Sequence, residues 1–237
     1  MGDRDPAQPL LTLVDGPARV ELSGATAANW VAKTAHLLTT ALGAPGRVGV
    51  LLPLHWQAVT LLLGAVTAGA EVVVPRSPAG LAGCGSAFTT AAAAATALDA
   101  GVDEVLAVST APLGGRLPDL PVLVLDAGRE LPVHGDTWTG PLSRSWAVEV
   151  DGRAATGLPR LPLGQADRVL TALDPRTPVG LLTGLLGPLQ AGSALVLCPV
   201  LPAGAALAAL LSAEGVTAVV GLDAPRLPRL DAPWQQA

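Results

Sequence analysis

The chain has 237 residues, of which half are apolar, and a formal net charge of −5. A chain of this kind can bury a sizeable core in one large domain or two small ones, so disorder along its whole length is excluded. Lys33 is the only lysine among 14 basic residues, and no run of Lys or Arg occurs, which argues against nucleic acid as a partner.

The first predicted elements are a hairpin and a helix. Residues 10–14 and 19–22 are predicted to form the two strands of the hairpin. Between them, Asp15-Gly16 can supply the positive φ that a tight turn needs. Apolar residues then recur at helical spacing from Ser23 to Gly43. Because Lys33 falls off that apolar stripe, we expect its side chain to point to solvent.

Unbroken apolar strands separated by helices come next. Residues 47–52 and 71–74 are short apolar runs on either side of an apolar helix at 56–68. This pattern is typical of parallel strands that helices cover on both faces. We therefore predict an α/β fold with a mostly parallel sheet and helices on both faces. Less distinct units of the same kind follow at 87–89, 91–100, 104–108 and 122–125.

The pattern is interrupted where prolines and glycines predict a loop-rich connector with one strand, at 146–150. Strands and helices return after it, at 168–170, 177–190, 194–198, 202–213 and 217–220. We expect three parts, of which the last packs with the first as one domain. These are a first α/β portion, 1–126, the connector, 127–165, and a second α/β portion, 166–237.

Several features bear on the cellular compartment. Cys84 and Cys198 lie far apart among small or apolar residues, so we expect two buried free thiols. Residues 1–8 lack the apolar run of a signal peptide, which indicates the cytoplasm. Glycines interrupt the apolar stretch 178–200, which we interpret as a helix and a buried strand. We expect no membrane partner.

Several motifs resemble a known family. Val20-Glu21-Leu22-Ser23, the RVGVLLP run at 47–53 and the GAVTAGAEVVVP run at 64–75 are similar to the opening motifs of acyl-adenylate-forming enzymes, which include the acyl-CoA synthetases. The stretches that match farther on, including DRVL at 167–170 and PLQAGS at 188–193, follow the phosphate loop in that family. More narrowly, the chain resembles a short bacterial subfamily of proteins related to the AMP-dependent synthetases. The resemblance implies a truncated relative of the family's N-terminal domain.

The family's phosphate loop has the form [ST]SG[ST]TGxPKG, and the resemblance allows one match. Residues 152–161 (GRAATGLPRL) keep Thr156 and Gly157 of the TGxP core and place Arg160 where the family has lysine. Alanines and Leu161 replace other small or hydroxyl positions. The segment also lies closer to Asp167 than the family spacing allows. Thr156, Gly157 and Arg160 are therefore either a remnant of nucleotide binding or part of a connector loop.

The resemblance also bears on catalysis. The sequence up to Ala237 does not reach the family's adenine segment, its ribose-binding aspartate or its C-terminal catalytic lysine. We therefore expect no catalytic residue and no resident cofactor. The expected function is that of a non-catalytic binding or interaction module, that is, a pseudoenzyme. The alternative is a subunit of, or residual enzyme in, the acyl-adenylate class, which would use ATP or AMP and Mg²⁺. A carrier that keeps the acyl or nucleotide pocket without turnover lies between the two.

Other residues are weaker candidates. His55 and Trp56 follow a predicted parallel strand, where α/β sheets place ligands, so they could line a ligand pocket. The alternative is that this segment caps the following helix and that Trp56 packs in the core. His36, His55 and His134 are too dispersed to predict a metal site. The apolar helices at 178–190 and from residue 202 predict a homo-oligomer or a protein partner that covers apolar surface.

Overall fold

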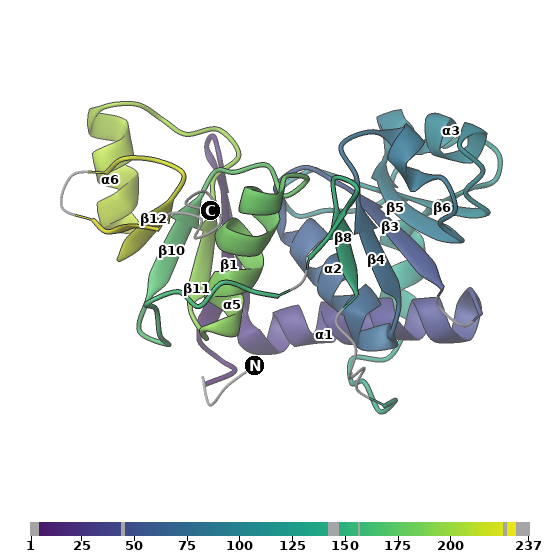
Figure 1. Ribbon diagram of the computed structural model, residues 1–237, viewed down its shortest axis with the longest axis horizontal. Helices are drawn as coiled ribbons and strands as arrows, with labels where there is room; N and C mark the ends of the chain where they lie inside the picture. The colour runs from purple at the N-terminus through teal and green to yellow at the C-terminus, as the bar shows by residue number, and fades with distance from the viewer. Residues whose placement is uncertain (1–4, 44–45, 142–146, 156, 225–226, 231–237) are drawn as a thin grey trace. The chain divides into compact units, whose positions relative to one another are not determined.

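The structure is a computed structural model that describes residues 5–43, 46–141, 147–155, 157–224 and 227–230. Its contacts divide the chain into two units that alternate along the sequence. The first unit takes the described parts of 1–25, 53–56 and 156–237, and the second takes those of 26–52 and 57–155. Each unit has a sheet of its own (Figure 1).

The sheet of the first unit has the order β13-β12-β10-β11-β1-β2. All neighbours are parallel except the hairpin of β1 and β2, which confirms the hairpin prediction. Gly16 in its turn has φ +56°. The strands are β1 (Pro9–Asp15), β2 (Ala18–Ser23), β10 (Arg168–Thr171), β11 (Ala194–Leu197), β12 (Ala218–Val220) and β13 (Arg229–Leu230).

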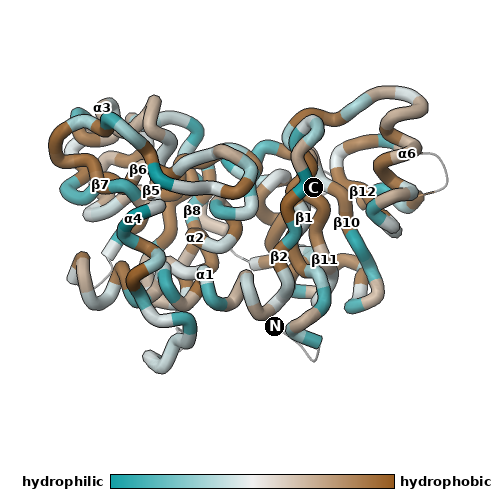
Figure 2. The backbone as a smooth tube through the Cα atoms, turned by 180° about the vertical axis from the view of Figure 1, so that it is seen from behind, coloured by the Kyte–Doolittle hydropathy of each residue, from teal (hydrophilic) through white to brown (hydrophobic). Residues whose placement is uncertain are grey.

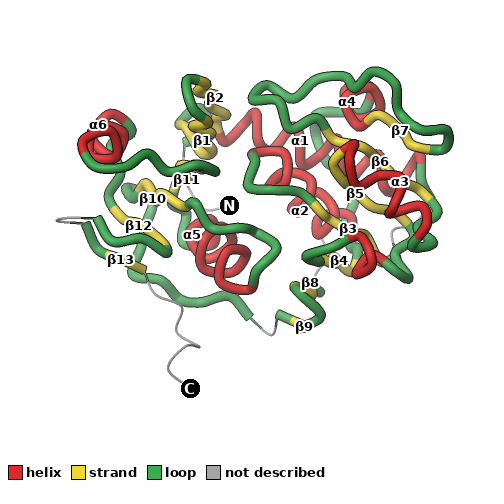
Figure 3. Tube along the Cα trace, turned by 90° about the horizontal axis from the view of Figure 1, so that it is seen from above, coloured by secondary structure: helices red, strands yellow, loops and turns green. Residues whose placement is uncertain are grey.

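The helices of the first unit lie on opposite faces of this sheet (Figure 3). A π-helix, η4 (Val179–Leu186), continues into α5 (Gly187–Gln190) and connects β10 to β11. Helix α6 (Ala205–Ala213) connects β11 to β12 on the other side of β10. Right-handed crossovers in opposite directions place helices on opposite faces. Most of η4 is buried, whereas no residue of α6 is.

The sheet of the second unit has the order β7-β6-β5-β3-β4-β8-β9. Its neighbours are parallel except the β8–β9 pair. Hydrophobic residues run along the central strands (Figure 2), whose side chains are buried. The strands are β3 (Arg47–Leu51), β4 (Glu71–Val74), β5 (Ser86–Thr90), β6 (Glu104–Val108), β7 (Val124–Asp126), β8 (Val148–Val150) and β9 (Arg153–Ala154).

Two long helices belong largely to the second unit and pack closely. A side chain at Gly64 would collide with Thr34, so the glycine allows α2 to approach α1. The π-helix η1 extends α1, and short helices complete the unit. The helical elements are α1 (Gly24–His36), η1 (Leu37–Ala41), α2 (Trp56–Ala68), η2 (Pro78–Leu81), α3 (Ala91–Asp99), α4 (Ala127–Glu130) and η3 (Leu131–Val133).

The predicted α/β class is confirmed, with two mostly parallel sheets in place of the single sheet that we expected. The strand predicted at 146–150 corresponds to β8, although residue 146 lies outside the described residues. This strand pairs in parallel with β4, through Val72 and Val148. Part of the predicted connector therefore extends the sheet of the second unit, which a local pattern cannot show because the pairing joins distant segments.

The expectation that Lys33 points to solvent is wrong. Its side chain is only 15% exposed and forms an ion pair of 2.7 Å with Asp136. The ammonium group also donates to the carbonyl oxygens of His134, at 2.6 Å, and Pro132, at 3.2 Å. The segment 132–136 covers the polar side of α1, so the face that periodicity assigns to solvent is occupied by a distant loop.

Two other expectations are confirmed. Cys84 and Cys198 are free and buried, and burial raises the pKa of both thiols. The apolar stretch 178–200 forms η4, α5 and the buried strand β11, as a helix followed by a strand. Within the described residues, no helix is both long enough and apolar enough to cross a membrane.

Candidate functional site

The carboxyl edge of the first unit's sheet contains a switch in strand order. The chain leaves β10 toward β11 on one side and then returns to β12 on the other side of β10. Open α/β sheets place ligands outside the carboxyl ends of the strands at such a switch. The loops after β10 and β12 therefore define the candidate site.

The loop after β10 is held by a two-point ion pair. Arg176 donates from Nε and Nη2 to the carboxylate of Asp174, with distances of 2.8–3.1 Å. Hydrogen bonding to this carboxylate raises the pKa of Arg176. Both side chains remain partly exposed. Our sequence reasoning missed this pair, although two opposite charges directly after a buried parallel strand are a signal that could have identified it.

The same loop begins the π-helix. Thr177 accepts a hydrogen bond at its Oγ1 from the backbone amide of Gly180, at 3.0 Å, just before η4 begins. A side chain at Gly180 would collide with the carbonyl oxygen of Asp174, so the glycine allows the loop to fold back on the helix. Within η4, Thr183 is fully buried, and its Oγ1 has no hydrogen-bond partner among the described residues. π-Helical turns often occur at functional sites.

The loop after β12 contacts the loop after β10. Gly221 has φ +72°, and a Cβ there would lie 2.5 Å from Cδ2 of Leu173. Beyond it, Asp223 accepts a hydrogen bond of 2.7 Å from Arg229. The two loops thus meet through a glycine and a leucine, and their carboxylates, Asp174 and Asp223, are paired with Arg176 and with Arg229 of β13.

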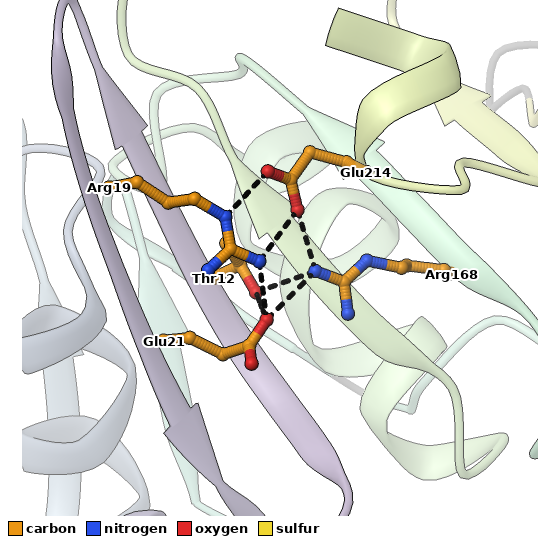
Figure 4. A network of polar contacts seen from close by, with 5 residues as sticks. All are labelled: Thr12, Arg19, Glu21, Arg168 and Glu214. Carbon is orange, nitrogen blue, oxygen red and sulfur yellow. Dashed lines mark hydrogen bonds and ion pairs between the residues drawn. The ribbon is translucent and has the colours of Figure 1, made fainter.

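A second polar group begins at the amino end of β10 and reaches across the sheet to the hairpin (Figure 4). Glu214, at the end of α6, accepts from Arg19 Nε at 2.7 Å and from Arg168 Nη2 at 2.8 Å. Glu21 accepts from Arg19 at 2.6 Å and from Thr12 at 3.2 Å. Arg168 also donates to Thr12. We call these five residues, Thr12, Arg19, Glu21, Arg168 and Glu214, the ion cluster.

The electrostatics of the ion cluster favour its charged form. The hydrogen bond from Arg19 is the main reason that the pKa of Glu214 lies below its usual value. Burial alone would raise the pKa of Glu21, but hydrogen bonds from Arg19, Thr12 and Arg168 and the charge of Arg19 together lower it. Both carboxylates already accept hydrogen bonds from arginines of the protein, so the cluster joins elements of the first unit.

The predicted remnant of a phosphate loop has no regular secondary structure in its described residues, 157–161. Thr156 lies outside the described residues, and Gly157 is exposed. Pro159 packs with Leu161 against Gly187 at the start of α5. Among the described arginines of the first unit, Arg160 alone has no ion pair. Nucleotide binding by these residues stays a prediction.

The candidates His55 and Trp56 lie inside the first unit. They are 4% and 3% exposed, and their rings lie 5.5 Å apart at 34°. Trp56 begins α2. His36 instead contacts the ring of Trp138 in the second unit. No three His, Cys, Asp or Glu residues within the described ranges are grouped so that they could hold a metal ion.

Comparison with solved structures identifies the class to which this fold belongs. An acyl-CoA synthetase from Brucella canis matches 91% of the chain with a TM-score of 0.73 at 19% identity. A benzoate-CoA ligase from Burkholderia xenovorans LB400 matches 96% with a TM-score of 0.69 at 17% identity, and ATP-bound MatB from Rhodopseudomonas palustris matches 92% with a TM-score of 0.67 at 16% identity. The fold is that of the N-terminal domain of acyl-CoA ligases. The chain spans 45%, 51% and 46% of these three proteins.

A sequence relative identifies the family. A Mycobacterium tuberculosis (strain ATCC 25618 / H37Rv) protein described as a TIGR03089 family protein is 38% identical over 203 residues. The match covers 81% of this chain and 83% of the relative. The chain belongs to the TIGR03089 family. No protein-family model matches it.

Proposed function

We propose that the chain is a non-catalytic binding module, with its ligand site at the carboxyl edge between β10 and β12. This proposal rests on the observation that most arginines of the first unit are paired with carboxylates. Four of its five described arginines are paired with carboxylates, two of them at this edge, in Arg176–Asp174 and Arg229–Asp223. The lysine is also engaged, by Asp136 in the second unit.

Adenylate formation instead requires positive charge that is free to contact phosphates. A carboxylate must attack a triphosphate, and cations must offset the charge on the phosphates as the reaction proceeds. A carboxylate beside Arg176 and another beside Arg229 would instead repel phosphate oxygens. This edge is better suited to a ligand of low charge, such as an uncharged acyl group, held by apolar contacts and loop backbone.

Two measurements test the proposal together. Mg²⁺-dependent exchange of pyrophosphate into ATP reports acyl-adenylate formation, and we expect only background exchange with any carboxylic acid. Thermal-shift titration reports binding without turnover, and a ligand at a hundredfold excess over its Kd should stabilise the fold by about 2.7 kcal/mol. We expect uncharged acyl ligands, such as fatty-acid methyl esters, to shift the melting point, whereas the phosphate-bearing ATP and acyl-CoAs should not do so.

Variants locate the binding event. Gly221→Val fills the contact between the two loops and should abolish an acyl-dependent shift. Leu113→Val, at an exposed loop position of the second unit, is the control. Pyrophosphate exchange above background would overturn the proposal, and so would the absence of any shift with the acyl panel.

A second candidate function is that of a subunit of an acyl-adenylating enzyme whose other half is a separate chain. Arg160, exposed and without an ion pair in the described part of the chain, favours it because it is free to contact a phosphate. Solved structures of the same fold include ATP-bound MatB and an anthranilate-CoA ligase in complex with anthranoyl-AMP. Calorimetric binding of ATP that is lost in Arg160→Ala, but kept in Arg153→Ala, would establish this function instead.

We also propose that the chain works as an oligomer or with a protein partner. The apolar stretch 178–190 no longer supports this, because it is largely buried within the first unit. Helix α6 supports it, since its sequence AALAALLSA is apolar and none of its residues is buried. A single monomeric species by light scattering over a wide concentration range would contradict the proposal.

A further inference from the structure

A cavity of about 270 Å³ lies within the second unit, at the amino ends of β3, β5 and β6. Leu38 and Leu42, at the end of the long first helix, form its apolar wall. Ser86, Asp103 and Glu104 supply its polar groups. The cavity is distinct from the proposed acyl site, which is built from residues of the first unit alone.

Ser86 presents an unused hydrogen-bonding group to this cavity. The residue is 8% exposed, and its hydroxyl forms no hydrogen bond within the described residues. It pairs with Val48 on one side and with Glu104 on the other, so the three side chains share a face of the sheet. Because Ser86 lines the cavity, its hydroxyl is available to hydrogen-bond a molecule that binds there.

The cavity carries a net negative charge. Asp103 and Glu104 lie at its exposed rim, and neither forms an ion pair with a described residue. Arg47 also lines it, but this guanidinium is occupied, because Nε donates to Glu71 at 3.0 Å and Nη2 to Glu149 at 2.9 Å. Two carboxylates therefore face the cavity without a matching cation, which favours a positively charged ligand.

We propose that this cavity binds a small primary ammonium ion with a short alkyl tail. An ammonium group has three donors and no acceptor. The Ser86 hydroxyl and the carboxylates of Asp103 and Glu104 are three acceptors among the residues that line the cavity. Leu38 and Leu42 supply apolar contacts for the alkyl tail. The volume is below the range of about 300–1,000 Å³ that is typical for drug-sized ligands, so the tail is short.

The probe is n-butylammonium chloride, titrated into the isotopically labelled full chain and followed by amide chemical shifts. We expect saturable shifts in the millimolar range at residues around Ser86, Glu104 and Leu38. n-Butanol has the same tail without the charge and should bind at least about tenfold more weakly, since hydrogen bonds to charged groups are stronger than neutral ones. Added salt should weaken the ammonium binding, because the carboxylates are exposed.

Three variants test the three acceptors, and a fourth is the control. Ser86→Ala, Asp103→Asn and Glu104→Gln should each weaken binding by about five- to tenfold, the size of one charge-assisted contact at a partly exposed site. Asp99→Asn removes an exposed carboxylate of α3 that does not line the cavity, and it should leave binding unchanged. Asp103 and Glu104 are exposed, so their variants should fold even where Ser86→Ala does not.

Each result either supports or overturns the assignment. Saturable binding that weakens in Asp103→Asn and Glu104→Gln, but not in Asp99→Asn, supports it. The assignment is overturned if no saturable shift appears up to about 100 mM n-butylammonium, a concentration about 100-fold above a millimolar Kd. Equal binding of n-butanol, or identical binding by wild type and Glu104→Gln, would also overturn it. The measurement does not depend on the acyl site, so either proposal can fail alone.

Discussion

Replacing Glu214 by glutamine tests the role of the ion cluster in the first unit. The substitution keeps the size of the side chain and removes its charge. Glu214 is 6% exposed and accepts charge-assisted hydrogen bonds from Arg19 and Arg168, of 2.7 Å and 2.8 Å. In Glu214→Gln, Arg168 remains mostly buried, with Glu21 as its nearest carboxylate. The variant therefore loses two strong contacts and leaves an imperfectly compensated guanidinium.

The expected loss is about 2 kcal/mol. One hydrogen bond to a charged group contributes about 1.5–3 kcal/mol, and removing one partner of a buried pair costs about 3–5 kcal/mol. Both values must be reduced because Arg19 is 49% exposed and solvent screens it. For a chain of this size, about 2 kcal/mol lowers the melting temperature by about 4–8 °C. Scanning calorimetry suits the measurement, because two units can unfold separately.

The effect should depend on pH in a defined direction. Because the folded-state pKa of Glu214 is lowered from 4.5, its contribution is complete above about pH 4.5 and is lost as the pH falls through the folded-state value. The difference between wild type and Glu214→Gln should therefore narrow in acid. Asp99→Asn is the control and should melt like the wild type. Coincident melting at pH 7, or a difference that stays constant down to pH 3, would refute this account of the cluster.

Three further predictions follow from single contacts. In urea unfolding, Gly221→Ala should lower the free energy of unfolding by about 2–3 kcal/mol, and Gly16→Ala should lower it by about 1 kcal/mol. Both glycines have positive φ, but only a side chain at Gly221 would clash, with Leu173. Equal losses in the two variants would show that the clash relaxes freely. Lys33→Met should speed amide exchange at residues 132–136, since the ammonium group holds that segment, and unchanged exchange would contradict this role. Cys84 and Cys198 should resist a thiol reagent at pH 8 until the chain is denatured, because burial raises their pKa and lowers the thiolate fraction; rapid labelling of the native chain would count against it.

Much of the fold could be predicted from the sequence because its signals are local. Continuous apolar runs such as 47–52 predicted buried parallel strands, and Asp15-Gly16 predicted the hairpin turn. These features depend on neighbours in the chain, and the backbone geometry of those neighbours follows from their type.

The candidate sites depended on tertiary structure. Asp174 and Gly221 lie nearly 50 residues apart, and only the pairing of β12 with β10 brings their loops to one edge. In the same way, the pairing of β5 with β6 places Ser86 beside Glu104. Strand order is set by which surfaces bury each other across the whole chain, so no local pattern specifies it.

The sequence by itself determined the class of the fold, the parallel character of its strands and the buried state of both cysteines. Only the tertiary structure decided that the strands form two sheets, that Lys33 is paired with Asp136, and that positive charge is compensated at the edge between β10 and β12. The physical reason is the range of the interactions. Periodicity and turns involve residues close in sequence, whereas ion pairs and strand order join residues that only the folded chain brings together.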